Sequence, residues 1–348
     1  MAELMKRAVM TAPKIIEFDK TEIPEIGVDE VLIKIMQIGV CGSDIHVYHG
    51  IHPYTTYPIV QGHETSGRVI KVGSAVTSLK VGDKVVPEPQ VFCGTCYPCT
   101  HGLYNICNEL KVIGFQQNGT AVDYFTYPAK MLVKLPGNMS YAEGAMIEPL
   151  SVAVRAVKKA GDVVGKQVLV IGAGPIGNLV AQTARGMGAS AVMISDINAF
   201  RLEKAKECGI DYTVDVSKSS LAEEIDANFG ADVKADVIFE CSGSQPGMDA
   251  AVDCARKGTD IIVVAVFSGK PAVDMAKVNE AELRLIGTAR YNIDDFRTAI
   301  DLVGDKKVAL IPLSTDEFDF FSYNQAYQKI DEHPESTMKV MIQINEED

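Results

Sequence analysis

Several features that mark other protein classes are missing from this chain of 348 residues. No uninterrupted apolar stretch reaches the roughly 18 residues that span a bilayer, so we expect no membrane role. The opening segment, residues 1–18, lacks the apolar block of a secretion signal, which predicts a cytoplasmic protein with reduced cysteines. Positive charge is in deficit, and a formal net charge of −13 argues against nucleic acid and anionic lipids as partners.

Internal repeats, low-complexity tracts and long charge runs are also missing, so we expect no array of linker-joined modules. Because single hydrophobic cores stop growing at about 250 to 300 residues, the length predicts two domains. Residues 1–150 read as mostly β, and the segment 142–159 as a helix interrupted at Pro149. From residue 167 strands alternate with helices, which is typical of a doubly wound parallel sheet. We expect strands at 31–35, 67–72, 84–87, 168–171, 191–195, 237–240, 261–267, 283–286 and 338–344, and helices at 294–302 and 323–331.

Four cysteines between residues 93 and 107 follow the spacing C-x2-C-x2-C-x7-C. Short C-x2-C turns bring thiolates onto one ion, so the spacing predicts a tetrahedral structural zinc site. A disulfide cluster is the alternative, but a chain of this length builds a core without covalent staples. The predicted ligands are Cys93, Cys96, Cys99 and Cys107. The other cysteines, Cys208, Cys241 and Cys254, are interpreted as small apolar packing residues.

A G-x-G-x-x-G motif, GAGPIG at 172–177, directly follows the strand expected at 168–171. Gly172 would make the tight turn, Gly174 would let the backbone approach a pyrophosphate, and Gly177 would allow close helix packing. Asp196 ends the next strand, where its carboxylate can accept bonds from ribose hydroxyls and repel a 2′-phosphate. The pattern therefore predicts NAD rather than NADP. The alternative is a structural βαβ turn with a solvated aspartate.

A second set of metal-type residues lies among glycines in the β-rich half. Cys41 lies in CGSDIH, His63 and Glu64 lie in GHETSG, and Glu148 precedes Pro149. A thiolate, an imidazole and carboxylates would hold zinc while leaving a position open, as catalytic sites do. Packing of these residues in a core is the competing interpretation.

Taken together, these motifs resemble the zinc-containing medium-chain dehydrogenase/reductase superfamily along essentially the whole chain. The segment GHETSGRVIKVGSAV at 62–76 is similar to its zinc signature. Glu148 in IEPLSVAV and the pair Arg290 and Tyr291 are most similar to sorbitol (L-iditol) and related polyol dehydrogenases. The resemblance implies an α/β protein: a GroES-like, mostly β catalytic domain at 1–150 and 290–348 with a zinc lobe at 88–110, and a Rossmann domain at 151–289.

The resemblance also implies roles for single residues. Cys41, His63, Glu64 and Glu148 would hold a catalytic zinc, making two zincs per chain. Asp44 would orient His63, and Ser43 with His46 would pass a proton outward, unless Ser43 and Asp44 only form the turn. Arg290 and Tyr291 would contact substrate. The implied cofactor-binding residues are Gly172, Gly174, Ile176, Gly177, Asp196, Arg201, Val264 and Val266.

The implied reaction is reversible, NAD-dependent oxidation of a secondary hydroxyl of a polyol to a ketose, in a homotetramer or homodimer. Two departures from the polyol enzymes concern residues near these motifs. Val47 stands where those enzymes carry a substrate-binding tyrosine, with Tyr48 next, and the four lobe cysteines are missing from several animal members. Alternatives are a 2,3-butanediol-type or threonine-type dehydrogenase, or a non-catalytic NAD-binding sensor.

Overall fold

A computed structural model describes residues 3–347 and divides them into two compact units. Within that range, the first unit comprises residues 3–148, 292–300 and 314–347, and the second comprises 149–291 and 301–313. The sequence assigned 1–150 and 290–348 to the first domain, whereas residues 149–150, 290–291 and 301–313 lie in the second unit. In the part of the chain that the structure describes, no helix is both long enough and apolar enough to cross a membrane.

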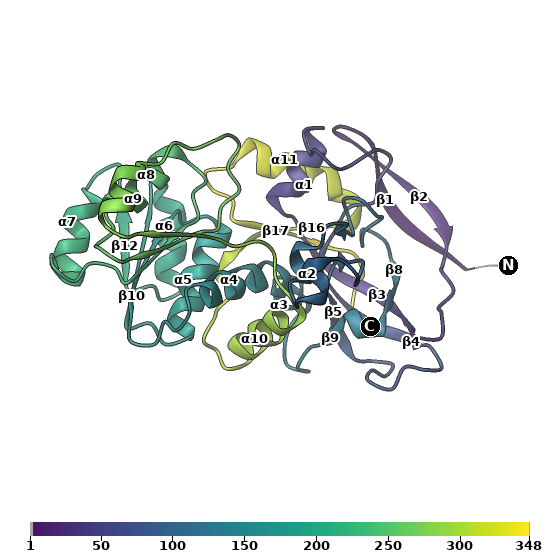
Figure 1. Ribbon diagram of the computed structural model, residues 1–348. Coiled ribbons are helices and arrows are strands. Elements are labelled where there is room, and N and C mark those ends of the chain that lie inside the picture. The colour runs from purple at the N-terminus through teal and green to yellow at the C-terminus, as the bar shows by residue number, and fades with distance from the viewer. Residues whose placement is uncertain (1–2, 348) are drawn as a thin grey trace. The chain divides into compact units, whose positions relative to one another are not determined.

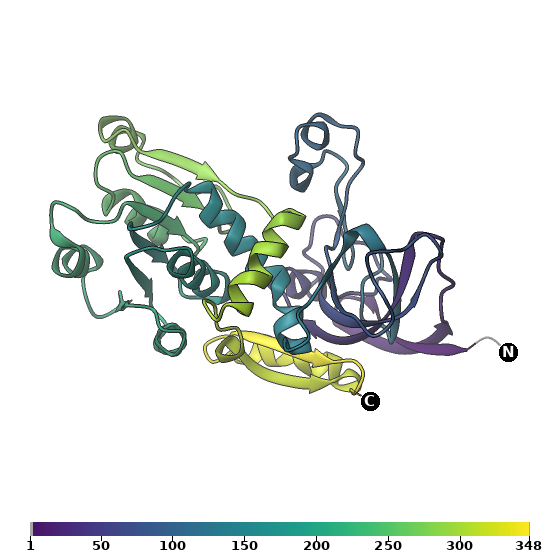
Figure 2. The same cartoon turned by 90° about the horizontal axis from the view of Figure 1, so that it is seen from below.

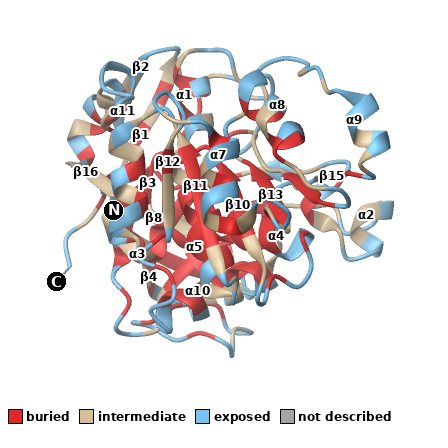
Figure 3. Cartoon of the chain, turned by 90° about the vertical axis from the view of Figure 1, so that its left-hand side faces the viewer, coloured by how far each residue is buried: buried red, intermediate tan, exposed pale blue. Residues whose placement is uncertain are grey.

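The second unit is built on a six-stranded parallel sheet in the order β12-β11-β10-β13-β14-β15. Helices connect successive strands, as parallel pairing requires (Figure 1). The four central strands are mostly buried, the edge strands β12 and β15 are more exposed, and the helices keep an exposed face, as the colours of Figure 3 show. The strands are β10 (Gln167–Ile171), β11 (Ala191–Asp196), β12 (Tyr212–Asp215), β13 (Val237–Glu240), β14 (Asp260–Val263) and β15 (Arg284–Gly287); the helices are α5 (Pro175–Gly186), α6 (Ala199–Glu207), α7 (Leu221–Ile225), α8 (Gln245–Asp253) and α9 (Met275–Glu280).

The first unit is built on a seven-stranded sheet, in which β8 pairs with β3 beside the path β16-β17-β3-β4-β5-β9. All its pairs are antiparallel except β16 with β17. A hairpin of β1 and β2 and a short pair of β6 and β7 complete it. The strands are β1 (Leu4–Ala12), β2 (Ile15–Glu22), β3 (Glu30–Gly39), β4 (Glu64–Val72), β5 (Lys84–Pro87), β6 (Gln90–Val91), β7 (Lys111–Val112), β8 (Tyr124–Pro128), β9 (Leu132–Lys134), β16 (Ser314–Asp319) and β17 (Lys339–Gln343).

Short helices lie at the ends of these strands. The lobe that carries four cysteines stands away from the sheet of its own unit as a separate loop, seen in blue in Figure 2. The helices of this unit include α1 (Gly42–Tyr48), α2 (Tyr97–Thr100), α3 (Tyr141–Ala145) and α11 (Tyr323–Glu332); α4 (Ile147–Lys159) and α10 (Ile293–Gly304) run on into the second unit, as the chain itself does.

Two sequence expectations about these elements were wrong in detail. The helix expected at 142–159 breaks at Met146, between α3 and α4, and not at Pro149. Pro149 is the third residue of α4, and a first-turn amide has no partner inside a helix, so proline costs little there. The strand expected at 261–267 stops at Val263, because the amides of Val264 and Ala265 both bond to the carbonyl of Glu240. The sequence also did not identify strand β12.

Candidate metal and nucleotide sites

The first candidate metal cluster consists of Cys41, His63 and Glu64, whose ligand atoms all lie within 4.8 Å of one another. Cys41 is the N-cap of α1, His63 directly precedes β4, and Glu64 is the first residue of that strand. The preceding Gly62 has φ +96°, and a Cβ there would lie 2.8 Å from Thr120 Oγ1. Only glycine therefore fits the turn that aims His63 at Cys41.

Asp44 connects the cysteine to the histidine. Its carboxylate accepts a hydrogen bond from the Cys41 amide at 2.9 Å and from the Gln61 side-chain amide at 3.2 Å, and lies 3.5 Å from His63 Nδ1. Burial opposes a charge on the His63 imidazole, but Asp44 and Cys41 outweigh it and hold its pKa well above the usual value. The Tyr327 hydroxyl in turn donates to Gln61 Oε1 at 3.1 Å. Asp44 is thus fixed from two sides, so it can orient the imidazole.

Glu64 has a partner that the sequence reading did not find. Lys339 Nζ lies 2.7 Å from both carboxylate oxygens of Glu64, and both side chains are almost fully buried. Glu148 is also buried, but it lies outside the group whose ligand atoms are within 4.8 Å. The predicted ligands therefore come together as three close residues, with Glu148 and Lys339 beside them.

The other predicted residues of this region lie along α1. Ser43 is half-buried and His46 is exposed, an order that runs from the cluster toward solvent. Val47 is fully buried, and the Tyr48 hydroxyl donates to the side chain of Asn324 at 3.1 Å. Tyr48 is therefore held against α11. It does not replace the tyrosine that polyol dehydrogenases carry at the position of Val47.

Two aromatic contacts extend the site beyond the ligands. The Phe115 ring lies 4.8 Å from the His63 ring, and the His52 ring stacks on Phe115 at 4.8 Å with an interplanar angle of 14°. Thr55 Oγ1 lies 2.7 Å from His52 Nδ1 and fixes the ring's rotation. Burial and the nearby His46 lower the pKa of His52, which favours a neutral imidazole. Neither His52 nor Phe115 belongs to a motif, and no local signal would have found them.

The second metal cluster is formed by the four lobe cysteines. Neighbouring sulfurs are 3.4 to 3.9 Å apart: Cys96 to Cys99 is 3.4 Å, Cys93 to Cys107 3.5 Å, Cys96 to Cys107 3.7 Å and Cys93 to Cys99 3.9 Å. A tetrahedron with Zn–S bonds of about 2.3 Å has edges of about 3.8 Å, so the sulfurs are already spaced for the ion. The amide and hydroxyl of Thr95 lower the pKa of the Cys93 thiol to about 6, which favours the thiolate that zinc requires.

The glycine motif of the second unit makes the turn between β10 and α5. Gly172 has φ +98°, and a Cβ on Gly177 would clash with the Gly172 carbonyl oxygen. A Cβ on Gly174, the N-cap of α5, would meet nothing within 4 Å and would fill the space in front of the helix N-terminus. This arrangement fits the pyrophosphate of a dinucleotide, whose negative charge suits that end of the helix.

Asp196 lies at the end of β11, beside this turn. Its carboxylate accepts from the amide of Ala173 at 2.7 Å and from that of Asn198 at 2.9 Å. The Asn198 side chain caps α6 and accepts from the amide of Arg201 at 3.1 Å. Asp196 therefore lies directly against the glycine turn, and Arg201 is linked to it only through Asn198.

The remaining predicted residues of the second unit differ in exposure. Val266 is 93% exposed, whereas Val264 and Ile176 are half-buried. Arg290 is exposed and has φ +52°, and the next residue, Tyr291, is 3% exposed. The two predicted substrate residues thus have opposite surroundings.

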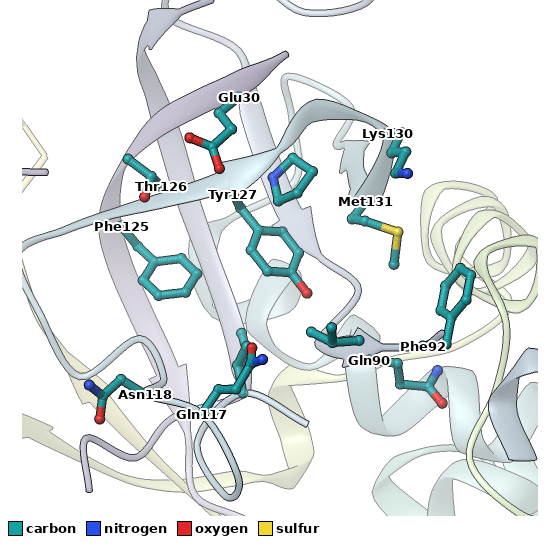
Figure 4. Close-up of a pocket in the computed structure, with 13 residues that line it drawn as sticks. Glu30, Gln90, Phe92, Gln117, Asn118, Phe125, Thr126, Tyr127, Lys130 and Met131 are labelled. Atoms are coloured by element: carbon teal, nitrogen blue, oxygen red, sulfur yellow. The ribbon is translucent and has the colours of Figure 1, made fainter. Parts of the chain in front are cut away.

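One pocket of the first unit does not coincide with either candidate metal cluster. It has a volume of about 390 Å³ and is lined by β8 and the segments next to the cysteine lobe. Figure 4 shows Phe125, Tyr127 and Met131 among the side chains around it. None of the predicted metal, cofactor or substrate residues lines this pocket.

Comparison with known proteins bears on both units. Residues 27–137 match the alcohol dehydrogenase GroES-like domain, and residues 175–305 match the zinc-binding dehydrogenase domain. Sorbitol dehydrogenase 1 of Saccharomyces cerevisiae is 39% identical over 322 residues, which cover 90% of each chain. Galactitol-1-phosphate dehydrogenase of Escherichia coli is 31% identical, with a TM-score of 0.89 over 97% of this chain and 100% of that one. A short chain alcohol dehydrogenase of Escherichia coli CFT073, complexed with NADH, is 32% identical, with a TM-score of 0.88 over 98% and 99%.

Proposed function

The chain belongs to the zinc-containing medium-chain dehydrogenase/reductase family, and on that premise we propose that it oxidises a secondary hydroxyl of a polyol reversibly to a ketose with NAD. The observation that carries this is the group of Cys41, His63 and Glu64, since one thiolate, one imidazole and one carboxylate leave a metal position open. The identity to a sorbitol dehydrogenase supports the substrate class.

Zinc bound at this cluster would supply a Lewis acid that lowers the pKa of the substrate hydroxyl. Cys41, His63 and Glu64 would hold the ion, with Glu148 next to them. Their donor atoms fit zinc, which accepts sulfur, nitrogen and oxygen ligands. Asp44 fixes the orientation of the His63 ring through the hydrogen bonds that hold its own carboxylate in place.

The hydroxyl proton must reach solvent, and two residues of α1 support a path. Ser43 is half-buried next to Asp44, and His46, one turn further along the helix, is exposed. We assign Ser43 as a relay whose hydroxyl oxygen accepts the proton while its own proton passes toward the His46 imidazole, which then releases a proton to water.

The nucleotide residues support NAD. A ribose at the turn of Gly172 to Gly177 would meet the Asp196 carboxylate, which accepts from hydroxyls and repels a phosphate. Arg201 would lie beside the same ribose, and Val264 and Val266 follow the end of β14, where the nicotinamide is expected. Arg290 and Tyr291 end the segment after β15 and are assigned to the substrate.

A sugar alcohol phosphate is a second candidate substrate, because galactitol-1-phosphate dehydrogenase is similar in sequence and in fold. A phosphate would need a cation, and exposed Arg290 is the predicted substrate residue that supplies one. A cytoplasmic location and a homodimer or homotetramer complete the proposal; light scattering on the purified protein tests the assembly.

A substrate panel with metal analysis tests the proposed function. The purified protein should reduce NAD with sorbitol, xylitol or L-iditol far more efficiently than with 2-propanol, 2,3-butanediol or threonine. Cys41→Ser should abolish this turnover, and Cys208→Ser, which changes a cysteine of the second unit, should not. A protein that binds NADH but turns over no alcohol would instead be a sensor. Preference for galactitol 1-phosphate or another phosphorylated polyol would select the second candidate.

A further inference from the structure

Lys339 is a buried cation in the middle of the first unit, with 4% of its side chain exposed. Its ammonium group donates to Glu64 Oε1 and Oε2, both at 2.7 Å, and to the Val40 carbonyl at 3.2 Å. An ammonium has three N–H donors, so every donor is used. Through these bonds Lys339 connects one predicted metal ligand, Glu64, with the residue that precedes another, Cys41.

The fold makes space for this ion pair. Strand β17 pairs with β3, and β3 pairs with β4, so Gly39 lies between the strand of Lys339 and the strand of Glu64. A Cβ at Gly39 would clash with Glu64 Oε2. The amide of Val40 also bonds to the carbonyl of Val340 at 2.9 Å, which fixes the start of β17 against the end of β3. The pair is therefore set by the backbone and does not depend on flexible surface side chains.

Negative charge surrounds Lys339. Its ammonium faces both oxygens of the Glu64 carboxylate at 2.7 Å, which is the geometry of a buried ion pair. Asp44, on α1, adds a further buried carboxylate near His63. Cys41, Asp44, Glu64 and Glu148 would thus lie near a divalent ion bound at this cluster, with the ammonium of Lys339 bonded to one of them. Removing Lys339 would take one positive charge away from this group.

We propose that Lys339 is a positioning residue that competes with the catalytic metal ion for the Glu64 carboxylate and offsets part of the negative charge around that ion. The proposal rests on the zinc site of the proposed function. Both oxygens of Glu64 already bond to Lys339, so a metal bond to Glu64 must share or replace one of these contacts. Lys339 thereby weakens Glu64 as a metal ligand, so the Glu64 carboxylate can exchange between Lys339 and the ion.

Replacing Lys339 should therefore tighten metal binding, which is the opposite of what loss of a merely structural residue would do. In Lys339→Met the Glu64 carboxylate is free to bind the ion with full charge. Chelator removal of the catalytic zinc, followed with a zinc-sensitive dye and counted separately from the lobe zinc, should become at least about tenfold slower. Zinc that leaves as fast as in the unchanged protein, or faster, would overturn the proposal.

The pH profile of kcat/KM provides the second readout. One more unit of negative excess near the metal stabilises the protonated form of the group that must lose a proton, so its pKa should rise by about one unit or more in Lys339→Met. Lys339→Arg keeps the charge and should leave this pKa within about half a unit. Lys206→Met, which removes an exposed lysine paired with Glu203 in the second unit, is the matched control and should change neither readout.

A double variant keeps the test decisive if Lys339→Met fails to fold. Lys339→Met with Glu64→Gln removes one charge of each sign and leaves no buried charge without a partner. In this double variant, the pKa seen in the pH profile of kcat/KM should stay within about half a unit of that of the unchanged protein. Its catalytic zinc should leave faster, because a ligand is lost. A shift of one unit in the double variant would contradict the charge argument. If the unchanged protein holds zinc only in the lobe, the proposed function itself fails, which is a different outcome.

Discussion

At the scale of single residues, buried charge is concentrated around Cys41. Asp44, His63, Glu64 and Lys339 are all 4% exposed or less, and hydrogen bonds or ion pairs connect them. Buried charges are costly when they lose a partner, so each of these residues depends on the others. Residues of the nucleotide site are more exposed and are open to testing one at a time.

Asp196 provides one such test. Asp196→Ala should weaken transition-state binding with NAD by about 1 to 3 kcal/mol, the order of a charge-assisted hydrogen bond, and should improve kcat/KM with NADP. Asp215→Ala is the matched control and should leave the preference for NAD unchanged. Asp215 ends strand β12 in register with Asp196, but it lies beside Ser217 and Lys218 instead of the glycine turn. Equal use of NAD and NADP by the unchanged protein would refute the role of Asp196.

Arg290 provides a test of substrate selection. Arg290→Ala should lower kcat/KM for polyols at least about tenfold, or roughly 1.4 kcal/mol, and leave 2,3-butanediol nearly unaffected, because only a longer substrate reaches the guanidinium. Alanine carries the same Cβ at φ +52°, so the substitution does not change the backbone strain. Arg297→Ala, at an exposed ion pair with Asp294, serves as control. An equal loss on both substrates would mark Arg290 as structural.

At the scale of elements, we expect the cysteine lobe to depend on a bound zinc ion for its stability. Cys99→Ser should lower the zinc content from two per chain to about one and lower the melting temperature, because structural zinc contributes folding free energy directly. Plasma emission analysis of the purified protein measures the content, and Cys254→Ser, a buried cysteine outside the lobe, is the control. A single zinc in the unchanged protein that survives in Cys99→Ser would mean that the lobe binds none.

The base of the lobe contains a buried carboxyl, Glu88. Gln90 donates to it at 3.1 Å, and Tyr127 donates to its backbone carbonyl at 2.9 Å. The Tyr104 hydroxyl lies beside it and accepts from the amide of Ile293, at the start of α10, at 2.5 Å. Burial raises the pKa of Glu88 to about 7, although Tyr104 and Gln90 partly oppose it. Glu88 is thus neutral in the folded protein at acid pH.

This shift has a definite sign for stability. Between its ordinary value of 4.5 and about 7, Glu88 keeps a proton in the folded state that the unfolded chain has lost. The free energy of unfolding therefore falls as pH rises through this window, on the order of 3 kcal/mol for this group. Glu88→Gln should melt at a progressively higher temperature than the unchanged protein between pH 5 and pH 8. Glu109→Gln changes an exposed acid of the lobe, and its melting temperature should differ from that of the unchanged protein by the same amount from pH 5 to pH 8. A constant difference in Glu88→Gln as well would contradict the raised pKa of Glu88.

At the scale of the whole molecule, the two chemistries belong to different units. The residues of both candidate metal clusters lie between positions 41 and 107, in the first unit. The glycine turn, Asp196 and Arg201 lie in the second unit. Removal of zinc should therefore abolish turnover while the dissociation constant of NADH, measured by its own fluorescence, stays within about threefold. Asp196→Ala should weaken NADH in both zinc-loaded and zinc-free protein. Loss of NADH binding on metal removal would contradict this separation.

The sequence by itself determined the features that are written in short contiguous motifs. Local backbone geometry and close spacing along the chain determine three features: the cysteine lobe, the turn at 172–177, and the placement of Cys41 and His63 in glycine-rich turns. All three are therefore visible in the sequence. Nine of the seventeen described strands and the helices α3, α4, α10 and α11 were predicted from such local patterns, and the errors at Met146 and Val263 arose where one hydrogen bond decides an element's end.

Only the tertiary structure decided the contacts between distant segments. Lys339 lies 275 positions from Glu64, and a single lysine in an apolar strand carries no local sign that a carboxylate faces it. The link from Tyr104 to Ile293, 189 positions apart, and the stacking of His52 on Phe115 are equally invisible in the sequence. Such pairs exist because strand order and register bring the segments together, and it is the folded sheet, through β17, β3 and β4, that makes Lys339 a neighbour of the metal ligands.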